Sequence, residues 1–443
     1  MKKKLKNLVD NYNLYKRENV VKFIKENPER LTLNVLLELA EFTNTQKSET
    51  AAYYTEKETL AQIEKFLPEI NKKVIHVLEP SAGAGNFLDI IINKYSNAEK
   101  LIIDLNDIDK ISIEIIKNLN KHRNIPENVE INYFNHDYLT YDFNKEYDLI
   151  IGNPPFLKLS KKTGLDIYSS IFNDNKTKNI AGFFLEKSVN MSENIALILP
   201  KYFLHNNDFA YIRDLVKKFN ISNIIDFGET GFKGVLIETI AIFINTCEKP
   251  NETIVYSVPR NYQNKEKQEI ITSDEFPSWI IYRNDFFNEI ASKMYLNIFK
   301  SFRDRQITNK ILKNDGDVRV IKSRNINREG TKIINITNYD SYINTEDLNK
   351  LSITKYLKKD DVYLCPNMTY YPRVIKKPKN VVVNGSVAIL ENKSSFKIND
   401  KDLRFFSSPT FEEFYRIARN YSTRSLNIDS NSVVFFGLLK ENR

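Results

Sequence analysis

The sequence has little of what builds disulfide-rich or membrane-embedded proteins. Only two cysteines occur in 443 residues, Cys247 and Cys365, and no CxxC pair is present. A disulfide framework and a zinc ribbon are therefore excluded. No run of 18 apolar residues occurs, which excludes a membrane-spanning helix. The N-terminal stretch carries charge every few residues, so it cannot supply the apolar core of a signal peptide. We expect a soluble, cytoplasmic protein.

The length and the charge distribution indicate at least two domains with different tasks. A chain of 443 residues is long enough for two or three domains. Residues 251–443 contain 32 Lys or Arg and 23 Asp or Glu, a net charge of +9, whereas residues 1–250 carry −1. A basic half is typical of a surface that binds a polyanion. A solvated basic surface is the alternative, and charge alone does not choose between the two.

Apolar runs and helical patterns alternate through the first half of the chain. Runs such as VIHVLEP end in polar turns and are followed by segments with helical periodicity. This alternation predicts a parallel sheet with crossover helices over residues 49–248. Residues 1–48 have the spacing of amphipathic helices and are predicted to form an N-terminal extension. Residues 249–301 are predicted to be a linker, and the short β-like runs of residues 302–443 predict a second, β-rich domain.

The strongest local motif is Asn153-Pro154-Pro155-Phe156, directly after the apolar run DLII. Ligands of open α/β sheets bind at this end of a strand. Two prolines fix φ and remove two N–H donors, so the loop presents carbonyl oxygens and the Asn153 amide to an amino group. Phe156 offers a flat apolar face to a planar ring. A simple strand-ending turn is the structural alternative.

A second motif, EPSAGAGNF (residues 79–87), also follows an apolar run and precedes a helical segment. Its glycines let the backbone approach a ligand. The third glycine of a dinucleotide fingerprint is replaced by Leu88, so NAD binding is poorly supported. Asp107-Ile108-Asp109 comes near the end of the next strand, where a carboxylate can accept hydrogen bonds from both hydroxyls of a ribose, and Asp137 follows the third strand. Helix caps or solvated turns would explain each of these acids about equally well.

The combination of motifs over residues 49–248 resembles the gamma, TaqI-like class of DNA adenine-N6 methyltransferases of type II restriction-modification systems. The order AYYT, EPSAGAGNF, NPPF and a C-terminal recognition domain is that of the family. The chain departs from it at Phe156, where tyrosine is usual, and at Glu56, where proline is common. The implied fold is an α/β, Rossmann-like S-adenosylmethionine-dependent methyltransferase domain with a helical N-terminal extension and a C-terminal mixed, β-rich target recognition domain.

The resemblance also implies residue roles. The cofactor S-adenosylmethionine would be bound by Tyr54, Thr55, Glu79, Ser81, Ala82, Gly83, Gly85, Phe87, Asp107, Ile108, Asp137, Tyr138 and Asn153. The catalytic residues would be Asn153, Pro154, Pro155 and Phe156, and the flipped target base would stack on Phe156 and Phe232. Candidate contacts to double-stranded DNA are Lys233, Arg303, Arg305, Arg324, Arg373, Lys376 and Arg424. No metal site is expected.

The implied function is methyl transfer to adenine N6 at a specific DNA site in a prokaryotic cytoplasm, protecting host DNA. A monomer is expected, and a cognate endonuclease, if one exists, is expected to be a separate chain. Two alternatives use the same NPP chemistry, namely methylation of RNA and of a protein glutamine side chain. The basic C-terminal half favours the DNA assignment over the glutamine one.

Overall fold

The structure is a computed structural model that describes residues 2–44, 57–172, 176–231, 237–367, 371–422 and 427–442. It divides into two compact units, unit 1 (Met1–Ile270) and unit 2 (Ile271–Arg443), and each is treated by itself. No helix in the described ranges is long and apolar enough to cross a membrane.

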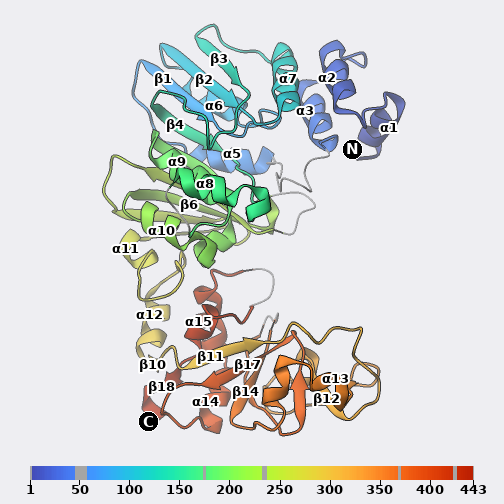
Figure 1. Ribbon diagram of the computed structural model, residues 1–443. Helices are drawn as coiled ribbons and strands as arrows, with labels where there is room; N and C mark the ends of the chain where they lie inside the picture. Colours follow the sequence, from blue (N-terminus) through green and yellow to red (C-terminus); the bar gives the residue numbers. More distant parts are fainter. Residues whose placement is uncertain are drawn as a thin grey trace. The chain divides into compact units, whose positions relative to one another are not determined.

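A nine-stranded sheet forms the centre of the described part of unit 1 (Figure 1). Its strand order is β3-β2-β1-β4-β5-β7-β6-β8-β9. The strands are β1 Val74–Glu79, β2 Lys100–Asn106, β3 Val129–Phe134, β4 Tyr147–Gly152, β5 Ser192–Pro200, β6 Asn220–Gly228, β7 Thr239–Asn245, β8 Glu252–Ser257 and β9 Tyr262–Lys267.

The predicted parallel sheet is confirmed for part of this order only. Strands β3, β2, β1, β4 and β5 are parallel, as continuous apolar strands buried on both faces predict. The remainder is mixed: β7 runs antiparallel to both β5 and β6, and β8 then pairs parallel with β6. Since β6 therefore runs in the same direction as β5, the carboxyl ends of β1, β2, β4, β5 and β6 share one edge of the sheet. We call it the carboxyl edge.

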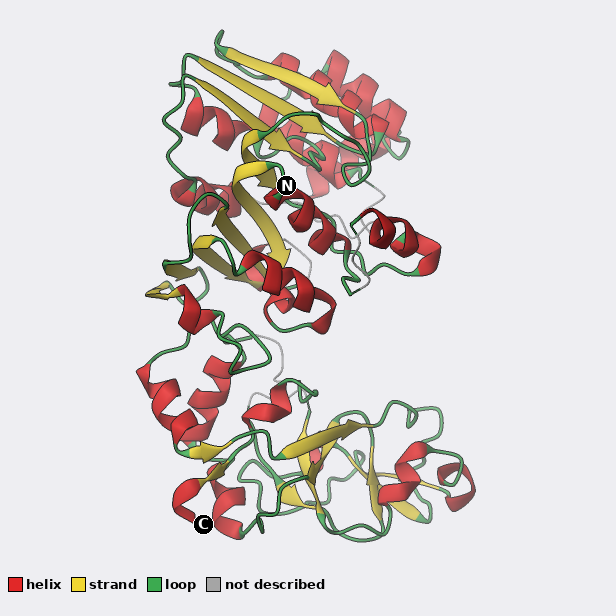
Figure 2. Cartoon of the chain, turned by 60° about the vertical axis from the view of Figure 1, so that its left-hand side comes forward, coloured by secondary structure: helices red, strands yellow, loops and turns green. Residues whose placement is uncertain are grey.

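Helices lie on both sides of this sheet (Figure 2). They are α1 Lys2–Asn11, α2 Arg17–Glu26, α3 Leu33–Phe42, α5 Lys57–Phe66, α6 Leu88–Tyr95, α7 Lys110–Leu119, α8 Leu165–Ile171, α9 Ile180–Val189, α10 Ala210–Val216 and α11 Gln268–Ile271.

The predicted N-terminal helices are packed against the sheet domain and are not a separate appendage. Helices α2 and α3 contact α7, and Figure 1 shows them beside it. Val20, Phe23 and Ile24 of α2 are buried, and Leu119 of α7 lies in the same apolar cluster. The amphipathic spacing of the N-terminal segment therefore reflects burial against α7.

Unit 2 contains three small sheets within its described residues: β11-β17-β14-β15, β13-β12-β16 and β10-β18. The strands are β10 Met294–Tyr295, β11 Phe299–Arg303, β12 Val318–Ile321, β13 Ser341–Ile343, β14 Val362–Pro366, β15 Ile375–Lys376, β16 Val381–Val383, β17 Val387–Asn392 and β18 Leu438–Leu439. The helices are α12 Asp285–Ser292, α13 Thr345–Leu348, α14 Asp400–Phe405 and α15 Pro409–Ala418.

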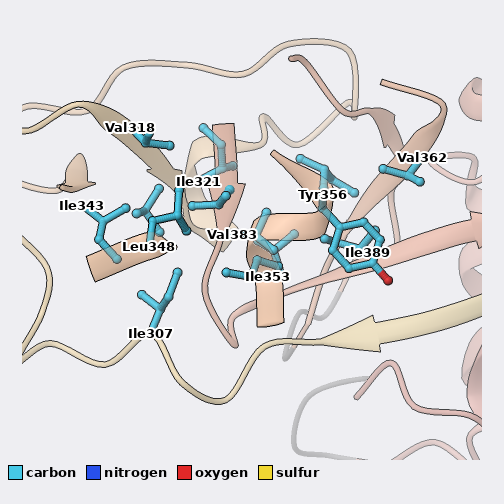
Figure 3. Packing of buried hydrophobic residues seen from close by; sticks show 14 of the residues in the cluster. Ile307, Val318, Ile321, Ile343, Leu348, Ile353, Tyr356, Val362, Val383 and Ile389 are labelled. Atoms are coloured by element: carbon cyan, nitrogen blue, oxygen red, sulfur yellow. The ribbon is translucent and has the colours of Figure 1, made fainter. Parts of the chain in front are cut away.

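Two of these sheets share one apolar core. Val320 of β12 and Val383 of β16 come from the three-stranded sheet, whereas Ile389 of β17 comes from the four-stranded one. The side chains of Ile353, Tyr356 and Ile389 lie close together in the same cluster (Figure 3). The short β-like runs predicted after residue 302 thus form a packed β-rich core, as expected.

The predicted linker at 249–301 is wrong over most of its length. Strands β8 and β9 occupy residues 252–267 and extend the unit 1 sheet. In unit 2, helix α12 packs on α15, and β10 pairs with β18. The sequence signal was weak because β8 buries only alternate residues and β9 is a polar strand at the sheet border.

Candidate active site at the carboxyl edge

The two motif loops leave neighbouring parallel strands at the carboxyl edge. The cofactor loop (residues 80–87) follows β1, and the NPPF loop (Asn153–Phe156) follows β4. The Ser81 hydroxyl donates to the main-chain oxygen of Asn153 at 3.2 Å. A Cβ on Gly152 would lie 3.3 Å from Pro80, so the absence of a side chain there lets the loops approach each other. The fold therefore brings both motifs into one site.

The cofactor loop turns through two glycines with left-handed backbone. Gly83 has φ +57° and Gly85 has φ +77°. A Cβ at Gly83 would meet no atom of the described residues within 4 Å, so its open side is space available to a ligand. At Gly85 the same atom would approach Ile116 at 3.4 Å. The glycine pair thus serves two different needs, ligand access at Gly83 and packing on α7 at Gly85.

A cavity of about 280 Å³ lies between these loops and their neighbours. Most of the predicted cofactor residues line it. The predicted residues in its wall are Glu79, Ser81, Ala82, Gly83, Phe87, Asp107, Ile108, Asp137, Tyr138, Asn153 and Pro155. Gly85, Pro154 and Phe156 are not in the wall. The separate motifs of the sequence therefore line one concave site. Small ligands bind in such concave sites.

Glu79 is a buried carboxylate at the bottom of this site. It is 1% exposed, and its Oε2 has no hydrogen-bond partner among the described residues. Burial raises the pKa of Glu79 well above its usual range, the Arg123 charge opposes this rise, and the nearby Asp107 carboxylate adds to it. A carboxyl group in such a position is best satisfied by a cationic ligand.

Asp107 is held by main-chain donors in the cavity wall. Its Oδ2 accepts from Gly83 N at 2.9 Å, and its Oδ1 accepts from Asp109 N at 2.9 Å. Burial nevertheless raises the pKa of Asp107 to about 6, because the two donors offset the desolvation only in part. Asp107 therefore links the glycine turn to the start of α7. Each carboxylate oxygen retains room for one further hydrogen bond.

The other predicted ligand residues surround the opposite end of the cavity. The Ile108 side chain is 68% exposed, although it is a large apolar group. Asp137 accepts from Leu139 N at 3.0 Å and from the Tyr168 hydroxyl at 3.1 Å. Tyr138 is 1% exposed and its hydroxyl lies 3.0 Å from Ser188 Oγ. This end offers an apolar face and a carboxylate, a combination suited to a planar heterocycle.

The N-terminal helices supply part of the wall that the sequence motifs did not reveal. Arg17, at the start of α2, forms an ion pair with Asp109 and donates to Ser112 Oγ at 3.1 Å. Asp109 is the N-cap of α7, which is the role that the alternative assignment of these acids predicted. The further wall residues that sequence analysis missed include Arg17, Ala40, Glu41, Asn44, Asn86 and Tyr168. Asn86 belongs to the EPSAGAGNF motif but was not assigned a role, whereas no local motif marks the others, because their place depends on packing between distant segments.

The NPPF loop presents its residues unequally. Asn153 and Pro155 line the cavity, whereas Phe156 is only 5% exposed and does not line it. Stacking of a base on Phe156 stays a prediction. Tyr54, Thr55, Phe232, Lys233 and Arg424 lie outside the described residues.

Basic residues of unit 2 fall into two groups. Arg303, Arg305, Arg324 and Lys376 are exposed. Arg373, by contrast, is 9% exposed, and its guanidinium donates to the main-chain oxygens of Ser323, Ile326 and Tyr371. The assignment of Arg373 as a DNA contact is therefore corrected. Its guanidinium is buried inside the unit, where its N–H groups donate to carbonyls of the turn at Ser323–Ile326.

Three cations lie beside aromatic rings in and around that turn, and of these Arg324 and Arg328 are exposed and Lys322 is half-buried. Lys322 Nζ lies 3.9 Å from the centre of the Tyr339 ring, and the Arg324 guanidinium lies 4.8 Å from it. The Arg328 guanidinium lies 4.2 Å from the Tyr371 ring. We call these five residues the basic-aromatic surface. Such a composition suits a nucleic-acid backbone and its bases.

Comparison with known proteins agrees with this site. Residues 29–232 match the family model described as Eco57I restriction-modification methylase. The matched residues begin after α2, include α3 and contain both motif loops. The match implies S-adenosylmethionine as the cofactor.

Two relatives each match about half of the chain. The type II methyltransferase M.VspI of Vibrio sp. (strain 343) is 26% identical over 229 residues, which is 51% of this chain and 55% of that protein. The type II methyltransferase M.AccI of Acinetobacter calcoaceticus is 29% identical over 226 residues, or 47% of this chain and 39% of that protein. The chain thus matches about half or less of the length of these relatives.

A solved structure has the same fold over nearly the whole chain. The type IIL restriction-modification enzyme MmeI, in complex with DNA, superposes with a TM-score of 0.51 and 13% identity. The superposition covers 94% of this chain and 67% of that one. The α/β fold of a methyltransferase with additional small C-terminal sheets is thereby confirmed.

The residues in the cavity fit the implied cofactor. S-Adenosylmethionine carries an ammonium and a sulfonium, two ribose hydroxyls and an adenine. The buried Glu79 carboxylate, with Oε2 unpartnered among the described residues, matches a cationic group. Asp107 matches the hydroxyls, and the exposed Ile108 side chain matches the face of the adenine. The cavity therefore holds groups suited to a cation, to the ribose hydroxyls and to the adenine of the ligand.

Proposed function

We propose that this protein is a DNA adenine-N6 methyltransferase of the gamma, TaqI-like class, acting in a restriction-modification system. One observation carries the proposal: Asn153 lines the same cavity as Glu79 and Asp107, and its main chain is bonded to the cofactor loop through Ser81. An exocyclic amino group that is to be methylated needs hydrogen-bond acceptors beside the methyl donor. The Asn153 amide oxygen and the carbonyl groups of the NPPF loop would be those acceptors.

The NPPF loop supplies hydrogen-bond acceptors and no acid-base group. S-Adenosylmethionine, when bound, supplies an electrophilic methyl group. The Asn153 side-chain oxygen and the Pro154 carbonyl accept the two N6 hydrogens, which turns the nitrogen lone pair away from the ring and towards the cavity. Glu79 and Asp107 orient the cofactor from the opposite side. Catalysis by this chain is therefore positioning and electrostatic stabilisation.

The adenine has to leave the duplex to reach this loop, which costs a few kcal/mol. Stacking on aromatic rings returns about 1 to 3 kcal/mol per base. Phe156 is one proposed ring, and Phe232 is the other. The topology supports the use of both rings at one site. Strand β6 ends at Gly228 and β7 begins at Thr239, both on the carboxyl edge, so the two ends of the connection that contains Phe232 lie at the same edge as the NPPF loop. Phe156 would have to become more accessible when DNA binds.

Unit 2 is proposed to be the target recognition domain. Its basic-aromatic surface, together with the exposed Arg303, Arg305 and Lys376, provides phosphate contacts and stacking faces. Double-stranded DNA is the proposed partner. A monomer suffices, since one strand is modified per encounter, and a cognate endonuclease would be a separate chain.

The test is transfer of labelled methyl from S-adenosylmethionine to unmethylated duplex DNA, followed by methylation-sensitive sequencing. Label at adenine within one sequence motif is expected. Asn153→Ala should lower the rate by at least about 100-fold, the scale of losing one oriented catalytic group, while cofactor binding by calorimetry stays intact. Label in RNA or protein instead of DNA would refute the proposed substrate, and full activity of Asn153→Ala would refute the role of Asn153.

A further inference from the structure

The NPPF loop cannot hold itself in place through its own main chain. Pro154 and Pro155 have no N–H groups, so this loop is rich in acceptors and poor in donors. Its carbonyl groups must find donors elsewhere. Ser81 Oγ serves the first residue of the loop by donating to Asn153 O at 3.2 Å.

Asn179 serves the last residue of the loop. Its Nδ2 donates to the main-chain oxygen of Phe156 at 3.3 Å and to the Tyr202 hydroxyl at 3.3 Å. Asn179 is 2% exposed. Tyr202 follows β5, so one amide group connects the loop after β4 with the segment after the neighbouring strand. The NPPF loop is thus held at each end by one side-chain donor.

The same side chain has a second, separable task. Asn179 is the N-cap of α9, where its Oδ1 accepts from Ala181 N at 3.1 Å. The main chain around it pairs with the segment that follows the NPPF loop: Ile180 N donates to Leu157 O at 3.0 Å, and Leu159 N donates to Lys178 O at 2.7 Å. The oxygen of the amide therefore stabilises the helix, whereas its nitrogen contacts the loop.

We infer that Asn179 is a positioning residue that fixes the NPPF loop through its Nδ2 donors. It contacts no reacting atom and acts through Phe156 and Tyr202. The effect on methyl transfer rests on the proposed function, whereas the effect on the order of the loop does not. A displacement of the acceptors by about 1 Å is enough to cost up to about 100-fold in rate.

Asn179→Asp separates the two tasks, because it is nearly isosteric and keeps the acceptor for Ala181 N but loses the donors. Asn179→Ser keeps a capping acceptor without adding charge and is too short to reach Phe156 O. Asn190→Asp is the matched control, since Asn190 is exposed and caps the other end of the same helix. Each full-length variant is examined by hydrogen-deuterium exchange of the peptide covering residues 156–160, by calorimetric cofactor binding and by single-turnover methyl transfer.

Both Asn179 variants should exchange faster in residues 156–160 and transfer methyl about 10- to 100-fold more slowly, with unchanged cofactor affinity. Their melting temperature should fall, because the buried Phe156 oxygen loses its donor. Asn190→Asp should match the wild type in each measurement. Unchanged loop exchange in the Asn179 variants would overturn the inference, whatever their activity. A defect in Asn179→Asp but not in Asn179→Ser would overturn it too, because added charge would then be the cause. If the wild type did not methylate DNA, the proposed function would fail, and the exchange measurement would still decide on Asn179.

Discussion

The carboxyl edge of unit 1 and the basic-aromatic surface of unit 2 present their polar residues in different ways. Glu79, Asp107 and Asn153 follow the ends of parallel strands, so the direction of each strand fixes where its residue lies. Arg324 and Arg373 lie in or beside turns between short strands, and only one of them is exposed. A motif at a strand end specifies a location, whereas a positive charge in a β-rich segment does not.

The largest expected effect tests this contrast directly. Arg373→Ala removes the donors to the carbonyls of Ser323 and Ile326 and leaves buried acceptors unsatisfied, which should destabilise unit 2 by about 2 to 4 kcal/mol. The single tryptophan of the chain, Trp279, is buried in unit 2, so its fluorescence during urea denaturation follows that unit.

Arg305→Ala is the control, because Arg305 is exposed and should leave the Trp279 transition in place. If Arg373→Ala shifted the midpoint no more than Arg305→Ala does, the structural role assigned to Arg373 would be wrong. A loss of DNA affinity without loss of stability would restore it as a DNA contact.

An intermediate effect concerns the carboxyl edge and pH. Burial raises the pKa of Asp107 to about 6 from 3.8, so the folded protein binds this proton more readily than the unfolded chain does. Below about pH 6 the carboxylate is lost as an acceptor, and cofactor affinity should fall by up to about tenfold per pH unit. The stability of the free protein should change in the opposite direction to the cofactor affinity. The contribution of Asp107 to the free energy of unfolding increases as the pH falls from about 6 towards 3.8, because the folded protein takes up the proton first.

Calorimetry between pH 5 and 8 measures how cofactor affinity depends on pH. Thermal melts of the free protein over the same range measure how its stability depends on pH. Asp107→Asn should weaken binding at pH 8 and flatten the pH dependence. It should not abolish that dependence, because burial also raises the pKa of Glu79. Affinity that stays constant between pH 5 and 8 would contradict the assignment of these carboxyl groups to the cofactor.

The smallest effect is expected at the exposed surface. Arg324→Ala should change stability by no more than about 1 kcal/mol, the loss of an exposed cation-π contact with Tyr339. If Arg324 contacts a phosphate, the slope of log affinity against log salt should decrease in magnitude by about one. Binding titrations of duplex DNA at several salt concentrations measure it, with Arg324→Lys expected to keep most of the slope. An unchanged slope would remove Arg324 from the interface.

Sequence analysis identified the two motif loops that the fold of unit 1 brings together. The EPSAGAGNF and NPPF motifs each follow a strand, and parallel strands bring their ends together without further information. It missed the contributions of Arg17, Asn179 and Tyr168, because each depends on a contact between segments far apart in the chain. Their residue types are unremarkable in isolation. An arginine on an amphipathic helix and an asparagine before a helix have many structural explanations.

The border between the units and the direction of β7 could not be predicted from the sequence, for a related reason. Strand β7 is buried like the parallel strands, so its apolar run carries no sign of its direction. Strand β9 is polar because it lies at the border of the sheet, and a polar run resembles a linker. Whether an arginine of unit 2 is buried or exposed depends on where the carbonyl groups of neighbouring turns point. No pattern of residue types encodes this.

The contact between the N-terminal helices and the cavity has a thermodynamic consequence. Arg17 of α2 is bonded to Asp109, two residues after Asp107, and Glu41 of α3 belongs to the cavity wall. A ligand that fills the cavity therefore binds more tightly to chains in which α2 and α3 are docked on α7. Ligand binding and helix docking must then stabilise each other by the same free energy. Protection of the first 44 residues from proteolysis would accordingly titrate with cofactor concentration. A fragment beginning at residue 49 would bind the cofactor more weakly, although it keeps Tyr54, Thr55 and both motif loops.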